Sequence, residues 1–374
     1  MEFRIERENL VSALQKAAQV LPARTAVMPV LHAVKIAAEE DRVWFEATDL
    51  EAAVRAAAPA EVAVPGTVVI PCRQLLDFAR HLDGALRFYR AEGVRTALEY
   101  SGGRVEFSGY EPESFPAFPQ VEPVEVLELD AGTLGEVARR VALVASDAVE
   151  SQPIFTGVFW DASEGRLAWV ATDTHRLAAL EGPEVSGRWT RVVPGRALAA
   201  AARFASEEDG TVRVTVGATW IGFEAGAFAV VARLLEGKYP NWRAVMPKSS
   251  SALLEGFDRS VLRAALQRAL LVARDTSDKN SAELVRIDLK PDGIVIAARG
   301  DSGSMAEEVP ARVQGSGTIH FNCRYLLDAV EAAGDGLRIR LSAENGEVTA
   351  AVVEGERYRH LVLPVIVRSD SGAA

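Results

Sequence analysis

Hydrophobic and polar positions alternate with two different periods along this chain. Six stretches carry apolar residues at spacings of three and four, as at Leu262, Ala265 and Ala269, which is the pattern of an amphipathic helix. These predicted helices cover residues 6–22, 72–82, 133–146, 196–204, 257–274 and 322–333. Other stretches alternate apolar and polar residues one by one and contain many β-branched and aromatic side chains, as in residues 42–49, 165–173, 211–226 and 293–300. The chain therefore predicts an α+β fold of amphipathic helices backed by antiparallel strands.

An arginine that follows a short strand and opens an apolar helix occurs three times. The three residues are Arg73, Arg196 and Arg324, which are 123 and 128 positions apart. A second series lies inside the other predicted helices, with spacings of 124 and 128, at Leu10, Leu134 and Leu262. Shared periods of this length indicate an internal repeat, which fixes the architecture of a chain before its details.

Two further pairs of residues share the period. The strand that reads EATD ends at Asp49, and the strand that reads VATD ends at Asp173, 124 positions later. The dipeptides Phe115-Pro116 and Tyr239-Pro240 are also 124 positions apart. We therefore expect three domains of about 125 residues, a common domain size, with boundaries at residues 1–123, 124–250 and 251–374.

The formal charge is distributed unevenly over the predicted elements. The chain of 374 residues carries a net charge of −11, which by itself argues against a nucleic-acid-binding protein. The six predicted helices, however, sum to +6, so the strands and loops carry −17. A helical face could thus attract phosphates while the rest repels them. The alternative is that arginine, which outnumbers lysine 35 to 6, is simply a good helix former.

Several classes of protein are disfavoured. No apolar run reaches the ~18 residues of a membrane-spanning helix, and the first residues, MEFRIERENL, are too charged for a signal peptide, so we expect a cytoplasmic protein with no membrane partner. Cys72 and Cys323 occupy equivalent positions in different repeats and are read as small buried hydrophobic residues, not a disulfide. We expect no metal and no cofactor.

Several motifs together resemble the bacterial β sliding clamp, the processivity subunit of the replicative DNA polymerase. They are ATDTHRLA at 171–178, EGKYPNW at 236–242, VMPK at 245–248, FNCRYLLDAV at 321–330 and a final apolar strand around a proline. The resemblance implies three similar domains in each protomer and a head-to-tail homodimer that closes a six-domain ring around duplex DNA. It also implies a protein that is not an enzyme, a separate ATP-driven clamp loader, and a groove that binds peptides of the replicative polymerase and other DNA-processing proteins.

The resemblance places the peptide groove between the second and third domains. The implied lining residues are Thr172, Thr174, His175, Arg176, Leu177, Pro240, Val245, Tyr325, Leu361, Val362, Leu363 and Pro364. The chain departs from the family beside the last proline, where Leu363 and Val365 stand in place of frequent methionines. Methionine adapts to varied partners, so a stiffer lining could narrow the set of peptides. The alternative for the apolar residues of this strand is the hydrophobic core.

The resemblance also implies residues for DNA and for the dimer. Arg24 and Arg73 match family positions that contact DNA, without reading sequence. Further candidates for the wall of the hole are Arg80, Arg139, Arg140, Arg196, Arg263 and Arg268. For the dimer we expect Leu271 and Val272 of one protomer to meet Phe107 of the other, with the core of a single domain as the alternative for all three.

Two other functions compete with this interpretation. Asp173 and His175 could serve as acid and base in an enzyme, although no GxSxG, HExxH or P-loop motif accompanies them and the first repeat lacks the histidine. A repeat-built scaffold without a DNA role would not require the separation of charge between helices and strands.

Overall fold

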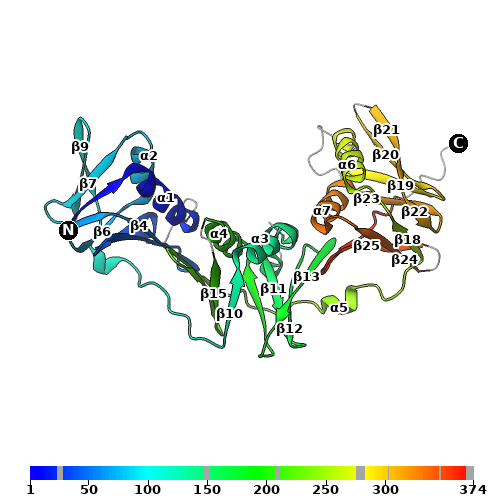
Figure 1. Cartoon of the computed structure of the whole chain (residues 1–374), viewed down its shortest axis with the longest axis horizontal. Coiled ribbons are helices and arrows are strands. Elements are labelled where there is room, and N and C mark those ends of the chain that lie inside the picture. The colour runs from blue at the N-terminus through cyan, green and yellow to red at the C-terminus, as the bar shows by residue number, and fades with distance from the viewer. Residues whose placement is uncertain are drawn as a thin grey trace. The chain divides into compact units, whose positions relative to one another are not determined.

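The structure is a computed structural model that describes residues 1–22, 28–146, 152–207, 210–274, 283–301, 303–344 and 347–367. It contains two compact units (Figure 1). The first unit combines Met1–Gly135 with Val193–Leu235, and the second combines Glu136–Val192 with Glu236–Ala374. Each unit is described by itself below. No helix among the described residues has the length and apolar character needed to cross a lipid bilayer.

Three repeats follow one another, and each runs strand, helix and three strands, twice over. The first repeat adds one short strand, β5, and consists of β1 (Glu2–Glu6), α1 (Arg7–Ala17), β2 (Ala33–Glu39), β3 (Arg42–Thr48), β4 (Ala52–Pro59), β5 (Glu61–Val64), β6 (Gly66–Pro71), α2 (Cys72–Ala79), β7 (Ala85–Arg90), β8 (Arg95–Tyr100) and β9 (Gly103–Ser108). The second consists of β10 (Glu125–Asp130), α3 (Ala131–Arg140), β11 (Gly157–Asp161), β12 (Arg166–Thr172), β13 (Arg176–Glu184), β14 (Thr190–Pro194), α4 (Gly195–Ala205), β15 (Thr211–Val216), β16 (Trp220–Ala225) and β17 (Phe228–Arg233).

The third repeat again adds a short strand, β22, in the same place as β5. After the linker helix α5 (Trp242–Val245) it consists of β18 (Ala252–Glu255), α6 (Arg259–Ala273), β19 (Leu284–Lys290), β20 (Gly293–Gly300), β21 (Gly303–Pro310), β22 (Arg312–Gln314), β23 (Gly317–Asn322), α7 (Cys323–Ala333), β24 (Arg338–Glu344), β25 (Glu347–Gly355) and β26 (Tyr358–Val362). Short 3-10 turns lie at η1 (Ala18–Val20), η2 (Pro29–His32), η3 (Pro112–Ser114), η4 (Ala142–Val144) and η5 (Pro153–Thr156).

Two of the four sheets join strands of neighbouring repeats. In the first unit, β4 pairs with β17 in an eight-stranded sheet of order β10-β15-β16-β17-β4-β3-β2-β6, beside a five-stranded sheet of order β5-β1-β7-β8-β9. In the second unit, β13 pairs with β26 in a nine-stranded sheet of order β14-β11-β12-β13-β26-β25-β24-β18-β22, beside a four-stranded sheet of order β21-β20-β19-β23. Continuous sheets across the repeat boundaries explain why the middle repeat is divided between two compact units.

The predicted α+β fold and its six helices are confirmed, with ends that differ by a few residues. Leu262, Leu266 and Leu270 form the buried stripe of α6, whose first backbone N–H groups bind the Asp258 carboxylate at 2.8 and 3.3 Å, as expected of an N-cap. Within the first and third repeats the paired helices pack side by side, α1 on α2 and α6 on α7 (Figure 1).

The two cysteines are fully buried at the starts of α2 and α7, and both are free thiols. Burial raises the pKa of Cys72 to about 12, against a weaker opposing effect of the Arg73 charge. These residues therefore behave as small hydrophobic side chains, as the sequence predicted.

Candidate functional site

The turn between β12 and β13 is held by its own threonine and aspartate. The Thr172 hydroxyl donates to the Arg176 carbonyl at 2.6 Å and accepts the Thr174 N–H at 3.1 Å. One Asp173 carboxylate oxygen accepts the backbone N–H groups of His175 and Arg176, both at 3.0 Å. These contacts hold Thr174 at φ +77°, a conformation that a β-branched residue rarely adopts.

The same turn occurs between β3 and β4, 124 residues earlier. The Thr48 hydroxyl donates to the Ala52 carbonyl at 2.8 Å, and the Asp49 carboxylate accepts the N–H groups of Glu51 and Ala52 at 3.0 and 2.7 Å. Leu50 takes the left-handed conformation there, with φ +74°. The Thr-Asp pair is therefore turn chemistry common to two repeats.

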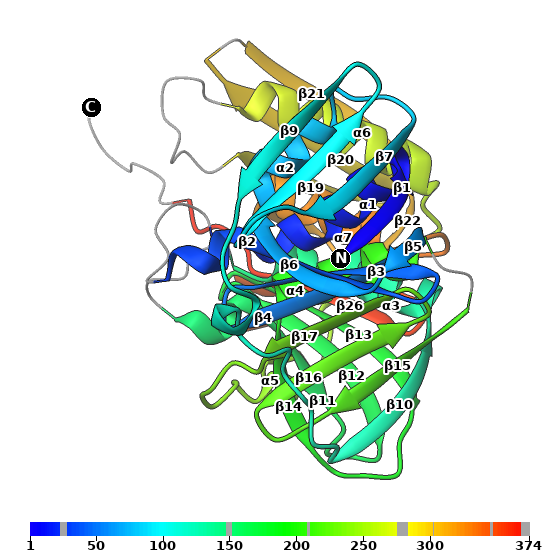
Figure 2. The same cartoon turned by 90° about the vertical axis from the view of Figure 1, so that its left-hand side faces the viewer.

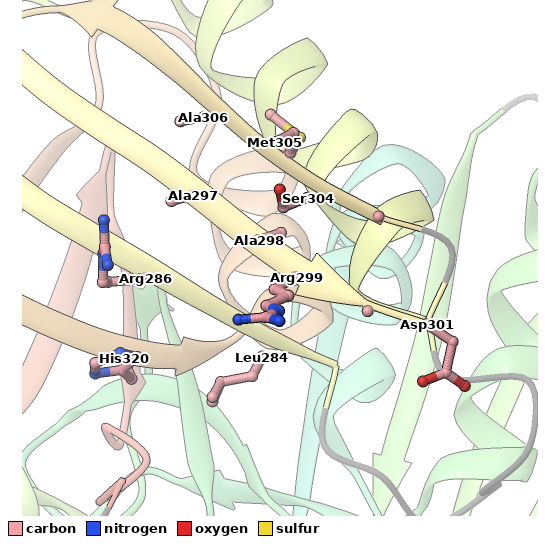
Figure 3. A pocket seen from close by; sticks show the side chains of 12 residues that line it. Leu284, Arg286, Ala297, Ala298, Arg299, Asp301, Ser304, Met305, Ala306 and His320 are labelled. Carbon is pink, nitrogen blue, oxygen red and sulfur yellow. The ribbon is translucent and has the colours of Figure 1, made fainter. Parts of the chain in front are cut away.

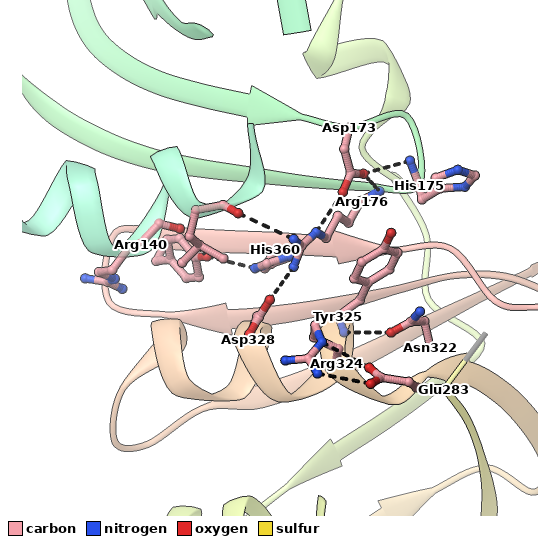
Figure 4. A network of polar contacts seen from close by, with 12 residues as sticks. Arg140, Asp173, His175, Arg176, Glu283, Asn322, Arg324, Tyr325, Asp328 and His360 are labelled. Atoms are coloured by element: carbon pink, nitrogen blue, oxygen red, sulfur yellow. Dashed lines mark hydrogen bonds and ion pairs between the residues drawn. The ribbon is translucent and has the colours of Figure 1, made fainter. Parts of the chain in front are cut away.

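Asp173 is not placed to act as a base with His175. One Asp173 carboxylate oxygen accepts the Arg176 Nε–H at 2.9 Å, and the other accepts the backbone N–H of His175. The hydrogen bond from His175 thus comes from its backbone and not from its imidazole ring (Figure 4). An acid–base pair would need a hydrogen bond between the carboxylate and the imidazole. The Asp173 carboxylate instead binds two backbone N–H groups and a guanidinium.

Arg176 ties β13 to helix α7. Its guanidinium pairs with Asp173 at 2.9 Å and with Asp328 at 2.6 Å, and lies 4.3 Å from the centre of the Tyr325 ring. Burial opposes the charge and by itself lowers the pKa of Arg176, but hydrogen bonds to Asp328 and Asp173 outweigh it and raise that pKa. Arg176 is only 8% exposed, and its guanidinium packs against the face of the Tyr325 ring.

The rings of His175, which is exposed, and Tyr325, which is half-buried, lie side by side. Their ring centres are 6.5 Å apart with an angle of 24° between the planes. Tyr325 lies in the first turn of α7, where its N–H donates to the Asn322 side chain at 3.2 Å. Figure 4 shows His175 projecting from the turn and Tyr325 rising from α7 on the same side as the turn.

The predicted apolar residues of the groove fall into two groups. Leu177 and Leu361 face each other across β13 and β26 and are 4% and 3% exposed, and Val362 is fully buried. Leu363 follows β26, donates its N–H to the His175 carbonyl at 3.0 Å and leaves 38% of its surface exposed. Among the predicted groove residues of this segment, Leu363 therefore has the most exposed side chain, and Pro364 beside it is half-buried.

The linker after β17 supplies further exposed apolar surface. Val245 is 50% exposed, and Pro240 is exposed as well. Trp242 beside them donates its indole N–H at 2.8 Å to the buried Asp161 carboxylate, which also contacts Arg243. A hollow of about 370 Å³ between this linker and strands β12, β13 and β26 is lined by Trp242, Met246, Ala168, Glu181 and Arg359.

The predicted DNA-contacting arginines differ in how they are paired. Five form ion pairs, which are Arg80–Asp77, Arg140–Glu136, Arg196–Asp49, Arg263–Glu331 and Arg268–Glu307. Arg73 and Arg139 are exposed and form no ion pair with any residue in the described ranges; Arg73 donates to the Pro22 carbonyl at 3.4 Å. Arg24 lies outside the described residues.

The arginines that open α2, α4 and α7 do not share one role. Arg196 pairs with Asp49 at 3.1 Å, and Arg324 binds the Glu283 carboxylate with two hydrogen bonds of 3.0 Å. Only Arg73 of the three keeps its charge unpaired among the described residues. The helices therefore present less uncompensated positive charge than the sequence count suggests.

The three predicted dimer residues also differ. Phe107 is 8% exposed and packs edge-on against Phe78 of its own domain, with ring centres 5.9 Å apart. Val272 is half-buried, and its backbone packs against Gly300 of its own domain, so closely that a Cβ at residue 300 would overlap the Val272 carbonyl. Leu271 is 67% exposed on α6, so among these three it has the surface that a partner needs.

No cluster of three histidine, cysteine or carboxylate residues suited to a metal ion occurs in the described part of the chain. A hollow of about 730 Å³ opens along β19, β20 and β21, where Arg286, Arg299 and His320 lie around Ala297 (Figure 3). Arg286 pairs with Asp288 at 3.0 Å. Its lining combines Arg286 and Arg299 with Asp301, and no group of described residues there is suited to a metal ion.

Sequence reasoning missed a buried histidine in the final strand. His360 is fully buried, with Nδ1 2.8 Å from the Tyr358 hydroxyl, which donates to the Arg140 carbonyl at 2.9 Å. Burial and, to a smaller extent, the Arg176 charge lower the pKa of His360 to about 3. A histidine alone among apolar residues in HLVLPVIV was the available signal.

We expect His360 to make the second unit acid-sensitive. Because its pKa in the folded state is about 3, against about 6.5 when unfolded, it contributes stability above about pH 6.5 that is lost as the pH falls through 3. The free energy of unfolding should fall by up to about 1.4 kcal/mol per pH unit from this group. Urea unfolding across the acid range should show that His360→Asn, which can still bind Tyr358, has a shallower slope; parallel curves for variant and wild type would contradict this role.

Comparison with known proteins supplies the family. Residues 1–119, 128–241 and 243–365 match the N-terminal, central and C-terminal domains of the DNA polymerase III beta subunit. The beta sliding clamp of Staphylococcus aureus strain Mu50 is 28% identical over 346 residues, 89% of this chain and 90% of that protein. The clamp of Staphylococcus epidermidis is 27% identical over 380 residues, 98% of this chain and 99% of that protein.

Solved structures agree with the sequence matches. A sliding clamp (DNA polymerase III subunit beta) from Pseudomonas aeruginosa, bound to griselimycin, has a TM-score of 0.87 at 26% identity, covering 98% of this chain and 100% of that one. The DNA polymerase sliding clamp of Bacillus subtilis has the same fold, with a TM-score of 0.89 at 23% identity and the same coverage. The chain therefore belongs to the DNA polymerase III beta subunit family, the bacterial β sliding clamps.

Proposed function

We propose that this protein is a DNA sliding clamp and not an enzyme. Two copies close head-to-tail into a ring around duplex DNA and tether the replicative polymerase and other DNA-processing proteins, after a separate ATP-driven clamp loader has opened the ring. The three domains are residues 1–123, 124–250 and 251–374. The protein works in the cytoplasm, where replication takes place.

The observation that carries this proposal is the order of strands at the ends of the sheets. Inside the chain, β4 pairs with β17 and β13 pairs with β26. In both pairs, the last strand in the first half of one repeat meets the last strand in the second half of the following repeat. The strands left over in the same positions are β21 and β9, and each ends its sheet among the described residues. A second copy can offer β9 to β21, and two such contacts close a ring of six repeats.

The arginines support sliding better than tight binding. Five of the seven described candidates already share their charge with a carboxylate. Partial pairing leaves a diffuse attraction for phosphates that weakens with salt, without the fork-like contacts to bases that would stop movement. Retention on DNA then comes from enclosure.

We infer that the surface around Leu363 binds a short peptide of a partner protein. Exposed Leu363 and Val245 offer apolar surface, and the rings of His175 and Tyr325 add an aromatic wall. Arg176, held by two carboxylates, keeps Tyr325 in place. We assign Arg176 as a positioning residue and the other four as contacts for partner peptides.

Enclosure predicts a specific result on DNA. Clamp loaded by its loader onto nicked circular DNA should remain bound through gel filtration and leave when the circle is cut once, because the ring slides off the ends. A linear DNA whose ends are blocked by bound proteins is the control and should retain the clamp. Retention on linear DNA with open ends would contradict the proposal.

A further inference from the structure

The first strand of each repeat lies at or near a sheet edge, and among the described residues two of the three have a covering strand while the third has none. The edge of β1 is covered by β5, and the edge of β18 is covered by β22, both in antiparallel pairing. The equivalent strand β10 ends the eight-stranded sheet next to β15 (Figure 2). Val126 on this strand is 40% exposed. An open edge of this kind is a template for another strand.

The two covered edges follow the same chemical rule. On β1, Phe3 lies opposite Val62 and Arg4 lies opposite Glu61. On β18, Leu254 lies opposite Val313 and Glu255 lies opposite Arg312, with 3.7 Å between the charged groups. Each edge thus takes a valine beside its apolar residue and the opposite charge beside its charged residue, and such cross-strand pairs stabilise sheets.

The middle repeat has the edge but not its cover. Leu127-Glu128 lies 124 positions after Phe3-Arg4. A spacing of 123, which is that from Arg73 to Arg196, puts Glu184-Val185 in the place of Glu61-Val62, and a glutamate there would oppose Glu128 with like charge. Instead Glu184 ends β13 and pairs with Arg166 at 2.8 Å, while the Val185 N–H donates to the Gly165 carbonyl at 3.0 Å.

The backbone of β10 is oriented to receive a strand. The Ala131 N–H donates toward β15, to the Gly210 carbonyl at 3.4 Å, as the Arg7 N–H does to Gly84 at 3.1 Å in the first repeat. In an antiparallel ladder the direction alternates from residue to residue. The N–H groups of Val126 and Glu128 therefore point to the open edge, where Glu2 and Arg4 meet β5 in the first repeat.

We propose that the open edge of β10 binds an extended segment of a partner protein that adds an antiparallel strand, with lysine or arginine opposite Glu128 followed by a β-branched residue opposite Leu127. Arg312-Val313 of β22 is the template for this segment. A second copy of β10 is a poor occupant, because its sequence EVLELD is acidic and holds no basic residue. Strand addition gains affinity from the backbone and specificity from alternate side chains.

Two peptides test this rule directly. One has the sequence of residues 310–315, PARVQG, and the other carries Glu in place of Arg312, with fluorescein on both. By fluorescence anisotropy the basic peptide should bind the full-length protein at least about tenfold more tightly than the acidic one. Glu128→Arg should reverse that preference. Glu224→Arg, which makes the same change at an exposed glutamate on β16 of the same sheet, is the control and should leave that preference unchanged.

A backbone variant separates strand addition from simple charge attraction. Val126→Pro removes an N–H that points to the open edge and leaves the ladder to β15, a position where edge strands tolerate proline. Binding of the basic peptide should fall at least about tenfold, while circular dichroism and the melting temperature show that the protein is folded. Equal binding of both peptides, no reversal by Glu128→Arg, undiminished binding to Val126→Pro, or no binding of either peptide would each overturn the proposal.

Discussion

Replacing Leu363 by aspartate should abolish binding of the polymerase peptide while the protein stays folded. The side chain is 38% exposed, so the free protein can solvate the new charge. A bound peptide would have to bury that charge without a partner, which should weaken binding at least about a hundredfold. Fluorescence anisotropy with a synthetic peptide that carries the polymerase's clamp-binding segment measures the loss.

The neighbouring residues provide the controls for this substitution. Ile366→Asp changes an 83% exposed residue three positions later and should leave peptide binding intact. Leu177→Asp is different, because Leu177 is 4% exposed and a charge there should unfold the second unit before any effect on peptides can be measured. Normal peptide binding by folded Leu363→Asp protein would show that the groove lies elsewhere.

Replacing Arg176 by methionine should strongly destabilise the second unit. The substitution leaves Asp173 and Asp328 facing each other without the guanidinium between them. Removing one partner of a buried ion pair costs about 3–5 kcal/mol of unfolding free energy. Urea unfolding followed by tryptophan fluorescence measures this cost, since Trp160 and Trp169 lie buried in the same unit.

A surface arginine on the adjacent strand gives the matched comparison. Arg359 pairs with Glu181 at 3.3 Å but is half exposed, so Arg359→Met should cost less than about 1 kcal/mol. Equal effects of the two substitutions would contradict the role given to Arg176. Tyr325 should also lose its orientation in Arg176→Met, which predicts weaker peptide binding by any protein that remains folded.

The repeat and its helices could be predicted from sequence because they depend on local patterns. Apolar periodicity located the helices, and the 124-residue spacing of Asp49 and Asp173 located a turn whose hydrogen bonds prove the same in both repeats. The joining of β4 to β17 and of β13 to β26 could not be predicted, because strand pairing between repeats has no local sequence signal.

Side-chain roles depend on neighbours that are distant in sequence. Arg176 matches a groove motif, yet it is buried and pairs with Asp328, 152 positions later. Arg196 fits a basic helical face, yet Asp49 of the preceding repeat pairs with it. Phe107 fits an interface strand, yet Phe78 of α2 covers it. In each case the residue type indicated a possible role, but the contact with a residue distant in sequence determines whether the side chain is free for that role.

The most direct test of the central claim is an electron-microscopy reconstruction of the purified protein. We expect a closed dimeric ring whose opening is wide enough for a DNA duplex and is lined by α1, α2, α3, α4, α6 and α7, with β9 of one protomer beside β21 of its partner. Leu271→Asp, which alters exposed surface on α6, should leave single protomers on the same grids. A dimer without a central opening, or an opening lined by carboxylates, would contradict the account.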